Sequence, residues 1–179
     1  AAFMNTFLGA AAAFLAWMFL DWSVTGKPTA VGSSIGLVVG LVAITPAAGF
    51  VTITSALIIG AVAAIICFFV ARAVKKITHL DDALDVFACH GIGGAFGMLA
   101  TGVFASGVGL MTGQTHTFLM HLAALLIVST FAFGGSFLLY KLVDLITPLR
   151  VSEDQEEMGL DMSQHGESMI DSDDETLME

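Results

Sequence analysis

Five long apolar segments constrain this chain more than any other feature of its sequence. Each approaches or exceeds the roughly 20 residues that an α-helix needs to cross the hydrocarbon core of a bilayer. The segments run over residues 2–20, 30–50, 52–73, 83–105 and 117–142. Only 12% of the 179 residues are charged, about half the fraction in a typical soluble domain. The sequence therefore predicts an all-α membrane protein with five transmembrane helices, surrounded by lipid and followed by a polar tail.

The basic residues predict how these helices are oriented in the membrane. With five alternating crossings, all of them fall on the same side, and the positive-inside rule makes that side cytoplasmic. We therefore expect a multi-pass protein of the plasma membrane, with the N-terminus of this chain outside and its C-terminal tail in the cytoplasm. The basic residues are Lys27, Arg72, Lys75, Lys76, Lys141 and Arg150.

The net charge of −10 belongs to the C-terminal tail. Residues 151–179 hold eleven Asp and Glu residues and no Lys or Arg. This change in composition predicts a transmembrane region over residues 1–150 and an acidic cytoplasmic tail over residues 151–179. Such a tail is either disordered or folded onto the cytoplasmic face near Arg150. Nothing in the charge pattern favours nucleic-acid binding.

Glycines recur at helical spacing in two of the apolar segments. Gly32, Gly36 and Gly40 form two overlapping GxxxG motifs, and Gly93 and Gly97 form a third. Small residues at this spacing let helix backbones approach closely in lipid. The pattern predicts helix packing at these positions and, by itself, nothing more specific.

The two cysteines, Cys67 and Cys89, both lie inside apolar runs and lack the spacing of metal ligands. We interpret them as small buried side chains rather than as a disulfide or a metal site. The sequence predicts no metal site, no cofactor and no enzymatic activity.

A histidine stands in the middle of the fourth apolar segment. Asp82, Val86, His90 and Gly94 are four residues apart and so share one face of a helix. His90 lies about ten residues, or roughly 15 Å of helical rise, from the expected helix cap, which places it near the bilayer midplane. An ionisable residue at that depth is a functional candidate. Its neutral imidazole has one donor and one acceptor, so it can pass a proton or hold a small polar molecule in a dry pore.

Three carboxylates precede this histidine. Asp81 and Asp82 stand where the helix is expected to begin, and there a carboxylate caps free N–H groups and complements the helix dipole. Asp85 lies one turn deeper, where a carboxylate needs a partner or water. We interpret Asp82 and Asp85 as structural carboxylates and expect the partners of Asp85 and His90 to lie outside this chain.

Three stretches of this sequence resemble the ammonium transporter family (Amt/Rh). DDALDVFACHGIGG resembles the family signature, and TGKPTAVGSSIGLVVGLVAITPAAGFV resembles the segment that precedes it. LRVSEDQEEMGLDMSQHGES resembles the cytoplasmic C-terminus of the Amt branch. The resemblance implies that the five segments are the last five of eleven spans. It also implies a homotrimer with one hydrophobic pore in each subunit.

The resemblance also implies roles for individual residues in the pore. His90 matches the second of two central histidines and would serve as a pore residue or proton relay. Val86 and Val38 match apolar pore-lining positions, and Asp82 matches a carboxylate with a structural role. The first histidine and the outer ammonium site belong to earlier spans, so the chain would form half a pore. We expect its five helices to leave an open groove faced by His90.

The same resemblance implies a regulatory role for two residues at the cytoplasmic face. Arg150 and Gly159 match the cytoplasmic segment, where a PII-type signal protein is a possible partner. Transport of ammonium or ammonia is the leading hypothesis, and a sensor of nitrogen status is the alternative with the same fold. A third hypothesis is a haem- or metal-binding helix bundle that uses His90 and His121, which lies one turn into the fifth segment.

Overall fold

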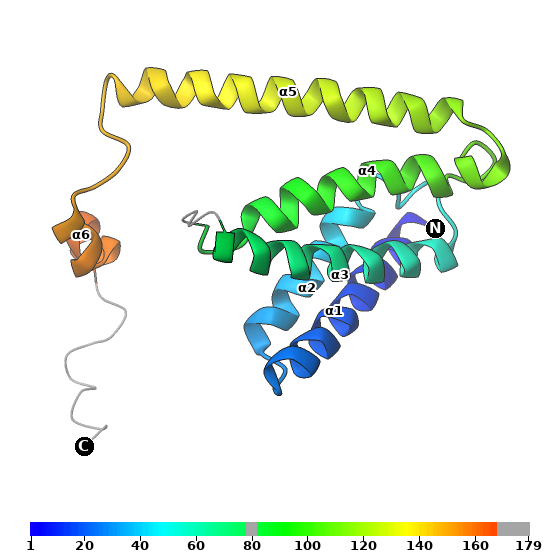
Figure 1. Ribbon diagram of the computed structural model, residues 1–179, viewed down its shortest axis with the longest axis horizontal. Coiled ribbons are helices and arrows are strands. Elements are labelled where there is room, and N and C mark those ends of the chain that lie inside the picture. The colour runs from blue at the N-terminus through cyan, green and yellow to red at the C-terminus, as the bar shows by residue number, and fades with distance from the viewer. Residues whose placement is uncertain (78–81, 168–179) are drawn as a thin grey trace. The chain divides into compact units, whose positions relative to one another are not determined.

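The computed structural model describes residues 1–77 and 82–167 (Figure 1). Every regular element in these residues is a helix, which confirms the predicted all-α class. Residues 1–129 and 130–179 form two compact units. The elements are α1 (Ala2–Thr25), α2 (Ala30–Ile44), α3 (Ile53–Ile77), the π-helix η1 (Phe87–Ile92), α4 (Gly93–Phe104), the short 3-10 helix η2 (Leu110–Thr112), α5 (His116–Asp144), α6 (Glu153–Met158) and the π-helix η3 (Asp161–His165).

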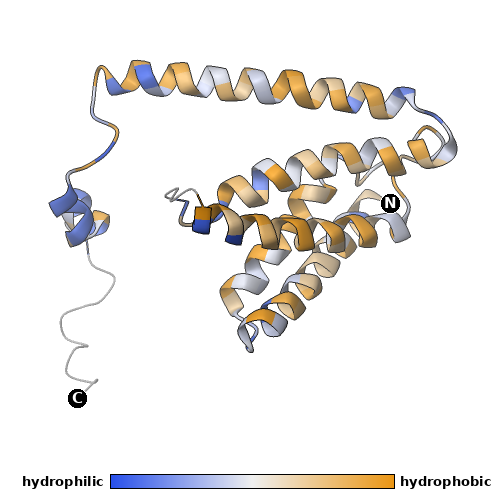
Figure 2. Ribbon diagram, viewed as in Figure 1, coloured by the Kyte–Doolittle hydropathy of each residue, from blue (hydrophilic) through white to orange (hydrophobic). Residues whose placement is uncertain are grey.

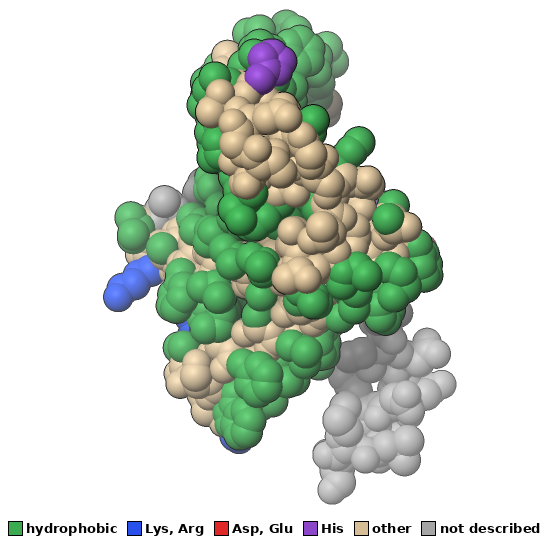
Figure 3. Space-filling model, turned by 90° about the vertical axis from the view of Figure 1, so that its right-hand side faces the viewer, with side chains coloured by type: hydrophobic (Ala, Val, Ile, Leu, Met, Phe, Trp, Pro, Cys, Tyr) green, Lys and Arg blue, Asp and Glu red, His purple; other side chains and the backbone are tan. Residues whose placement is uncertain are grey.

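Four helical stretches in the described residues are long and apolar enough to cross a membrane. They are Ala2–Thr25, Ile53–Ile77, Phe87–Phe104 and His116–Asp144. Their apolar character appears as the predominantly orange ribbon in Figure 2. Hydrophobic side chains also cover most of the face shown in Figure 3, with basic side chains at its edge. The protein therefore has the helices of a membrane protein.

The second apolar segment forms a shorter helix than its sequence predicts. We expected a span over residues 30–50, but α2 ends at Ile44 after 15 residues. Pro46 has no N–H group to continue the helical hydrogen bonds. Beyond it the chain forms turns, in which the Ala47 N–H donates to the Ile44 carbonyl at 2.9 Å. The predicted bound at residue 50 is wrong, and a count of five spanning helices stays a prediction.

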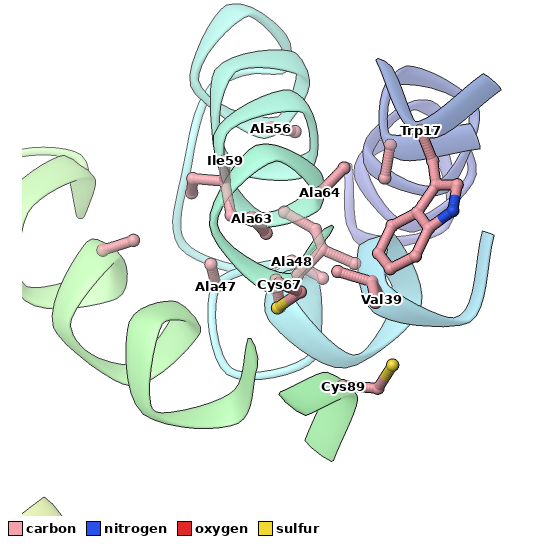
Figure 4. Packing of buried hydrophobic residues seen from close by; sticks show 14 of the residues in the cluster. Trp17, Val39, Ala47, Ala48, Ala56, Ile59, Ala63, Ala64, Cys67 and Cys89 are labelled. Carbon is pink, nitrogen blue, oxygen red and sulfur yellow. The ribbon is translucent and has the colours of Figure 1, made fainter. Parts of the chain in front are cut away.

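The core of residues 1–129 is built largely from alanine (Figure 4). Helix α1 packs on both α2 and α3, and α2 also packs against α4. Because Ala13, Ala43 and Ala63 are fully buried and small, the helix backbones lie close together. Larger side chains fill the remaining space, and the Trp17 ring meets the Phe68 ring edge-on with centroids 5.2 Å apart.

The glycines of α2 lie against α1. A Cβ atom at Gly36 would meet the Trp17 side chain, and one at Gly40 would lie 2.6 Å from the Ala13 Cβ atom. A Cβ atom at Gly32 would meet the carboxylate of Asp21, near the C-terminal end of α1. The stripe of three glycines therefore faces α1 along the length of α2.

The two glycines of the GxxxG motif in α4, Gly93 and Gly97, lie against other helices. A Cβ atom at Gly97 would meet the carbonyl oxygen of Ala43 in α2. One at Gly93 would lie 3.3 Å from the Cys67 Sγ atom of α3. Both positions bring α4 close to the core of residues 1–129.

None of the 29 residues of α5 is buried. Its aromatic side chains are among the most exposed of the described residues, with Phe131 79% and Phe133 78% exposed. A helix that is apolar on all sides needs lipid or other apolar helices around it. The fifth segment therefore has the character expected of a membrane span.

Candidate functional site

The fourth apolar segment begins with an irregular turn, followed by the π-helix η1. The sequence predicts a helix from residue 83, but the first helical element starts at Phe87. The reason is the backbone at Asp85, which has φ 55 and so departs from the right-handed helical path. The predicted start is wrong by about one turn. The segment from Phe87 to Ile92 is a π-helix and carries His90.

His90 is exposed and faces a groove of about 490 Å³ between α2 and η1. The structure brings together the three side chains that the sequence singled out for a pore, namely His90, Val86 and Val38. Most of the other lining residues are apolar. The complete lining is Ala30, Val31, Ser34, Ile35, Val38, Leu84, Val86, Cys89 and His90.

Asp82 caps the segment that carries His90. Its Oδ1 atom accepts a hydrogen bond from the Val86 N–H at 2.8 Å, and its Oδ2 atom accepts one from the Phe87 N–H at 2.9 Å. These are two of the N–H groups that the start of a helix leaves without a partner. Asp81, the other expected cap, lies outside the described residues.

Asp85 is 7% exposed and forms an ion pair inside this chain. Its Oδ2 atom lies 2.8 Å from Nζ of Lys75, near the C-terminal end of α3. The expectation that the partner of Asp85 lies outside the chain is therefore wrong. Two residues ten apart in sequence meet because α3 ends beside the start of η1.

A second, more polar pocket of about 550 Å³ lies next to the groove and shares Val31 and Ile35 with it. Asp21, which is part of its lining, accepts a hydrogen bond from the Thr29 hydroxyl at 2.7 Å. The guanidinium of Arg72 lies 4.0 Å from the other oxygen of the Asp21 carboxylate. Charged groups are thus concentrated beside one end of an otherwise apolar groove.

His121 contacts a backbone carbonyl group of its own helix. Its Nδ1 atom lies 2.8 Å from the Thr117 carbonyl oxygen. It does not line the groove with His90. No observation on the described residues therefore favours the haem or metal hypothesis, which requires both imidazoles at one site.

The model of the Ammonium Transporter Family matches residues 1–170 of this sequence. The chain belongs to the ammonium transporter family. It is 42% identical over 173 residues to an ammonium transporter of Bacillus subtilis, covering 93% of this chain and 43% of that protein. It is also 42% identical over 165 residues to ammonium transporter Amt1 of Archaeoglobus fulgidus, covering 88% of this chain and 41% of that protein.

Solved structures of the family have the same fold. The crystal structure of Saccharomyces cerevisiae Mep2 superposes with a TM-score of 0.81 at 34% identity, over 91% of this chain and 39% of that one. A structure described as a sensor Amt protein gives a TM-score of 0.81 at 27% identity, over 92% of this chain and 41% of that one. The chain therefore spans less than half the length of these members of the ammonium transporter family.

An ion pair connects Arg150 to the first helix of the tail in this family member, α6. The Arg150 guanidinium donates two hydrogen bonds to the Glu156 carboxylate, at 2.7 and 2.9 Å. These hydrogen bonds hold the pKa of Glu156 below its ordinary value. Gly159, with φ 90, follows the end of α6 at Met158. The predicted regulatory residues Arg150 and Gly159 thus flank one short helix, and their role in regulation stays a prediction.

Apart from purely apolar lining residues, sequence reasoning did not assign three residues to this site. Ser34 and Cys89 line the groove, and Lys75 pairs with Asp85. Ser34 stands four residues before Val38, so helical spacing could have placed it on the same face of α2. Lys75 has no such signal, because its partner stands ten residues later and belongs to a different apolar segment.

Proposed function

We propose that this chain is the C-terminal part of an ammonium transporter, and that its His90 groove is one wall of the pore. The observation that carries this proposal is the meeting of His90, Val86 and Val38 in one largely apolar groove. A charged ammonium ion is costly to place among such side chains, whereas ammonia is neutral. Ammonium therefore gives up a proton before the apolar lumen, and ammonia crosses it.

His90 has the chemistry for this passage. A neutral imidazole offers ammonia one hydrogen-bond donor or acceptor in a lumen that otherwise has few. Through its two nitrogens it can also hand on the proton that ammonium releases. Which of these tasks His90 performs decides whether net charge crosses the membrane.

The opposite wall of the pore belongs to earlier spans in this proposal. The chain spans less than half the length of its relatives. We infer that residues preceding Ala1 supply the first histidine and the outer ammonium site. We also infer that the complete protein is a homotrimer in the plasma membrane.

Contacts between helix ends support the inferred alternation of the spans. Asp21 at the end of α1 lies near Arg72 at the end of α3, and both would face the cytoplasm. At the opposite ends, Asn5 of α1 donates to the carbonyl oxygen of Val51, between α2 and α3. This pairing of ends is the one that alternating crossings require. The positions of the basic residues add the inference that the N-terminus of the chain is outside and the tail is in the cytoplasm.

Replacing His90 tests the pore assignment. In the complete transporter, His90→Ala should lower methylammonium uptake between about 5- and 150-fold, because losing one hydrogen-bonding partner in a dry site costs about 1–3 kcal/mol. His121→Ala is the matched control, since this second imidazole does not line the groove. Uptake and currents equal to the parent at equal expression would contradict a pore role for His90.

The half-pore proposal has its own test. Residues 1–179 produced alone, in cells that lack other ammonium transporters, should not support ammonium uptake. Robust uptake by this chain alone would show that it does not need a second wall from earlier spans.

A sensor of ammonium is the second candidate function. The specific observation that favours it is the structural similarity to a protein described as a sensor Amt protein. Uptake into proteoliposomes separates the two candidates, because a transporter moves methylammonium without other proteins. Both candidate functions are compatible with a PII-type partner that binds the cytoplasmic face near Arg150 and Gly159.

A further inference from the structure

The start of the His90 segment has an unusual backbone. Asp85 is the only non-glycine residue with a positive φ angle among the described residues, at 55°. Side chains with a Cβ atom avoid this region, although aspartate and asparagine adopt it more readily than most. A residue in such a conformation persists only where its surroundings hold it.

The groups of Asp85 are held on three sides. Its N–H donates to the Asp82 carbonyl at 3.3 Å, and its carbonyl accepts from the Cys89 N–H at 2.9 Å. Its carboxylate lies 2.8 Å from the Lys75 ammonium, the length expected for a charge-assisted hydrogen bond. Lys75 belongs to α3, which is packed against α1 in the core. The ion pair therefore connects the irregular turn to the most firmly packed part of the molecule.

We propose that Lys75 and Asp85 are positioning residues for His90. Their ion pair holds the left-handed turn at Asp85, and this turn fixes where η1 begins and how it is rotated. The inference rests on the proposed function, because it takes the His90 groove as a pore wall. π-helical turns of this kind occur often at functional sites. If Asp85 relaxed to a right-handed conformation, Val86, Cys89 and His90 would rotate together relative to α2.

The residue types allow charge and backbone conformation to be tested separately. Asp85→Asn removes the charge and still tolerates a positive φ angle. Asp85→Gly adopts that angle freely but removes the side chain. Lys75→Gln removes the partner charge, and Lys75→Arg retains it. Lys76→Gln is the matched control, since it removes the same charge from the neighbouring residue of α3.

The labelling rate of the Cys89 thiol measures the conformation of this turn independently of transport. It is 3% exposed and stands next to His90. In the complete transporter carrying Cys67→Ala, we expect N-ethylmaleimide to label Cys89 about tenfold faster in Lys75→Gln and in Asp85→Asn, because local opening exposes the thiol. Lys75→Arg and Lys76→Gln should label at the parent rate. Equal labelling rates in all variants would overturn the proposal.

Uptake kinetics test the connection to His90. In Lys75→Gln and Asp85→Asn we expect the maximal rate of methylammonium uptake to fall about fivefold or more with KM unchanged, because the outer binding step is untouched. Lys75→Arg should restore the rate. Faster labelling with unchanged uptake would refute a positioning role. If His90→Ala itself left uptake unchanged, the proposed function would fail, while the labelling experiment would still report on the turn.

Discussion

The contact between α1 and α2 at Gly40 predicts how much stability the protein loses when a side chain is added there. A Cβ atom at Gly40 would lie 2.6 Å from the Ala13 Cβ atom, 2.7 Å from the Ala10 Cα atom and 2.7 Å from the Gly9 carbonyl oxygen. Carbon atoms in ordinary contact are about 3.5–4.0 Å apart. Two of the three neighbours are backbone atoms, so no side-chain rotation relieves the overlap. The two helices must therefore separate by about 1 Å.

Gly40→Ala should lower the stability of the protein, although alanine is the better helix former. The gain in helix propensity is at most about 1 kcal/mol. Overpacking costs about 1–3 kcal/mol, and the upper end applies because a gap of about 1 Å weakens van der Waals contacts along the whole interface. The net loss is then about 2 kcal/mol. At about 2–4 °C per kcal/mol, the melting temperature in detergent should fall by about 4–8 °C.

Gly94→Ala is the matched control for this experiment. Its Cβ atom would have Val42 Cγ1 as its nearest neighbour, at 3.9 Å, which is an ordinary contact. The melting temperature should stay level or rise slightly. Gly36→Leu, which would drive a larger side chain into Trp17, should lower it further than Gly40→Ala. If Gly40→Ala and Gly94→Ala melted at the same temperature, the close approach of α1 and α2 would be refuted.

Two further predictions concern polar contacts. The Glu156 carboxyl should titrate below its ordinary pKa of 4.5, because Arg150 donates hydrogen bonds to its charged form. The Arg150–Glu156 pair is therefore intact above pH 4.5 and is lost as the pH falls through the lowered pKa of Glu156. Carboxyl-carbon NMR measures this pKa, and the variant Arg150→Gln is the comparison. Asn5→Ala should lower the melting temperature, because it leaves the carbonyl oxygens of Ala48 and Val51 without the Asn5 donor. Each carbonyl group left unpaired should lower the free energy of unfolding by about 1–3 kcal/mol. An unchanged melting temperature would show that water replaces the amide.

The features that the sequence predicted well depend on composition or on helical spacing. Apolar length marked the membrane helices, because each must hold its own backbone hydrogen bonds in lipid. Spacing by four placed Val86 and His90 on one side of their segment, where both line the groove. Spacing also placed Gly36 and Gly40 on one face of α2, and that face lies against α1. Val38 came from family resemblance alone.

The features that the sequence did not predict arise where local geometry departs from the regular helix. The early end of α2 results from a single missing N–H group at Pro46, inside an otherwise apolar run. The π-helix that carries His90 begins two residues after Asp85, which has a left-handed backbone conformation. The Asp85 carboxylate pairs with Lys75, a residue of another helix. Periodicity describes one helix at a time, so it cannot show an ion pair that joins two.

Helix α2 connects the packing of the protein to the groove. Residues two apart on an α-helix point in directions about 200° apart, so Ser34 and Val38 lie opposite Gly36 and Gly40. One face of α2 consists of glycines against α1, and the other lines the groove with His90. Because the helix is thin on its packed side, a displacement of about 1 Å at Gly40 would move Val38 by a similar amount relative to His90. Glycine at these positions therefore sets the width of the groove as well as the stability of the helix pair.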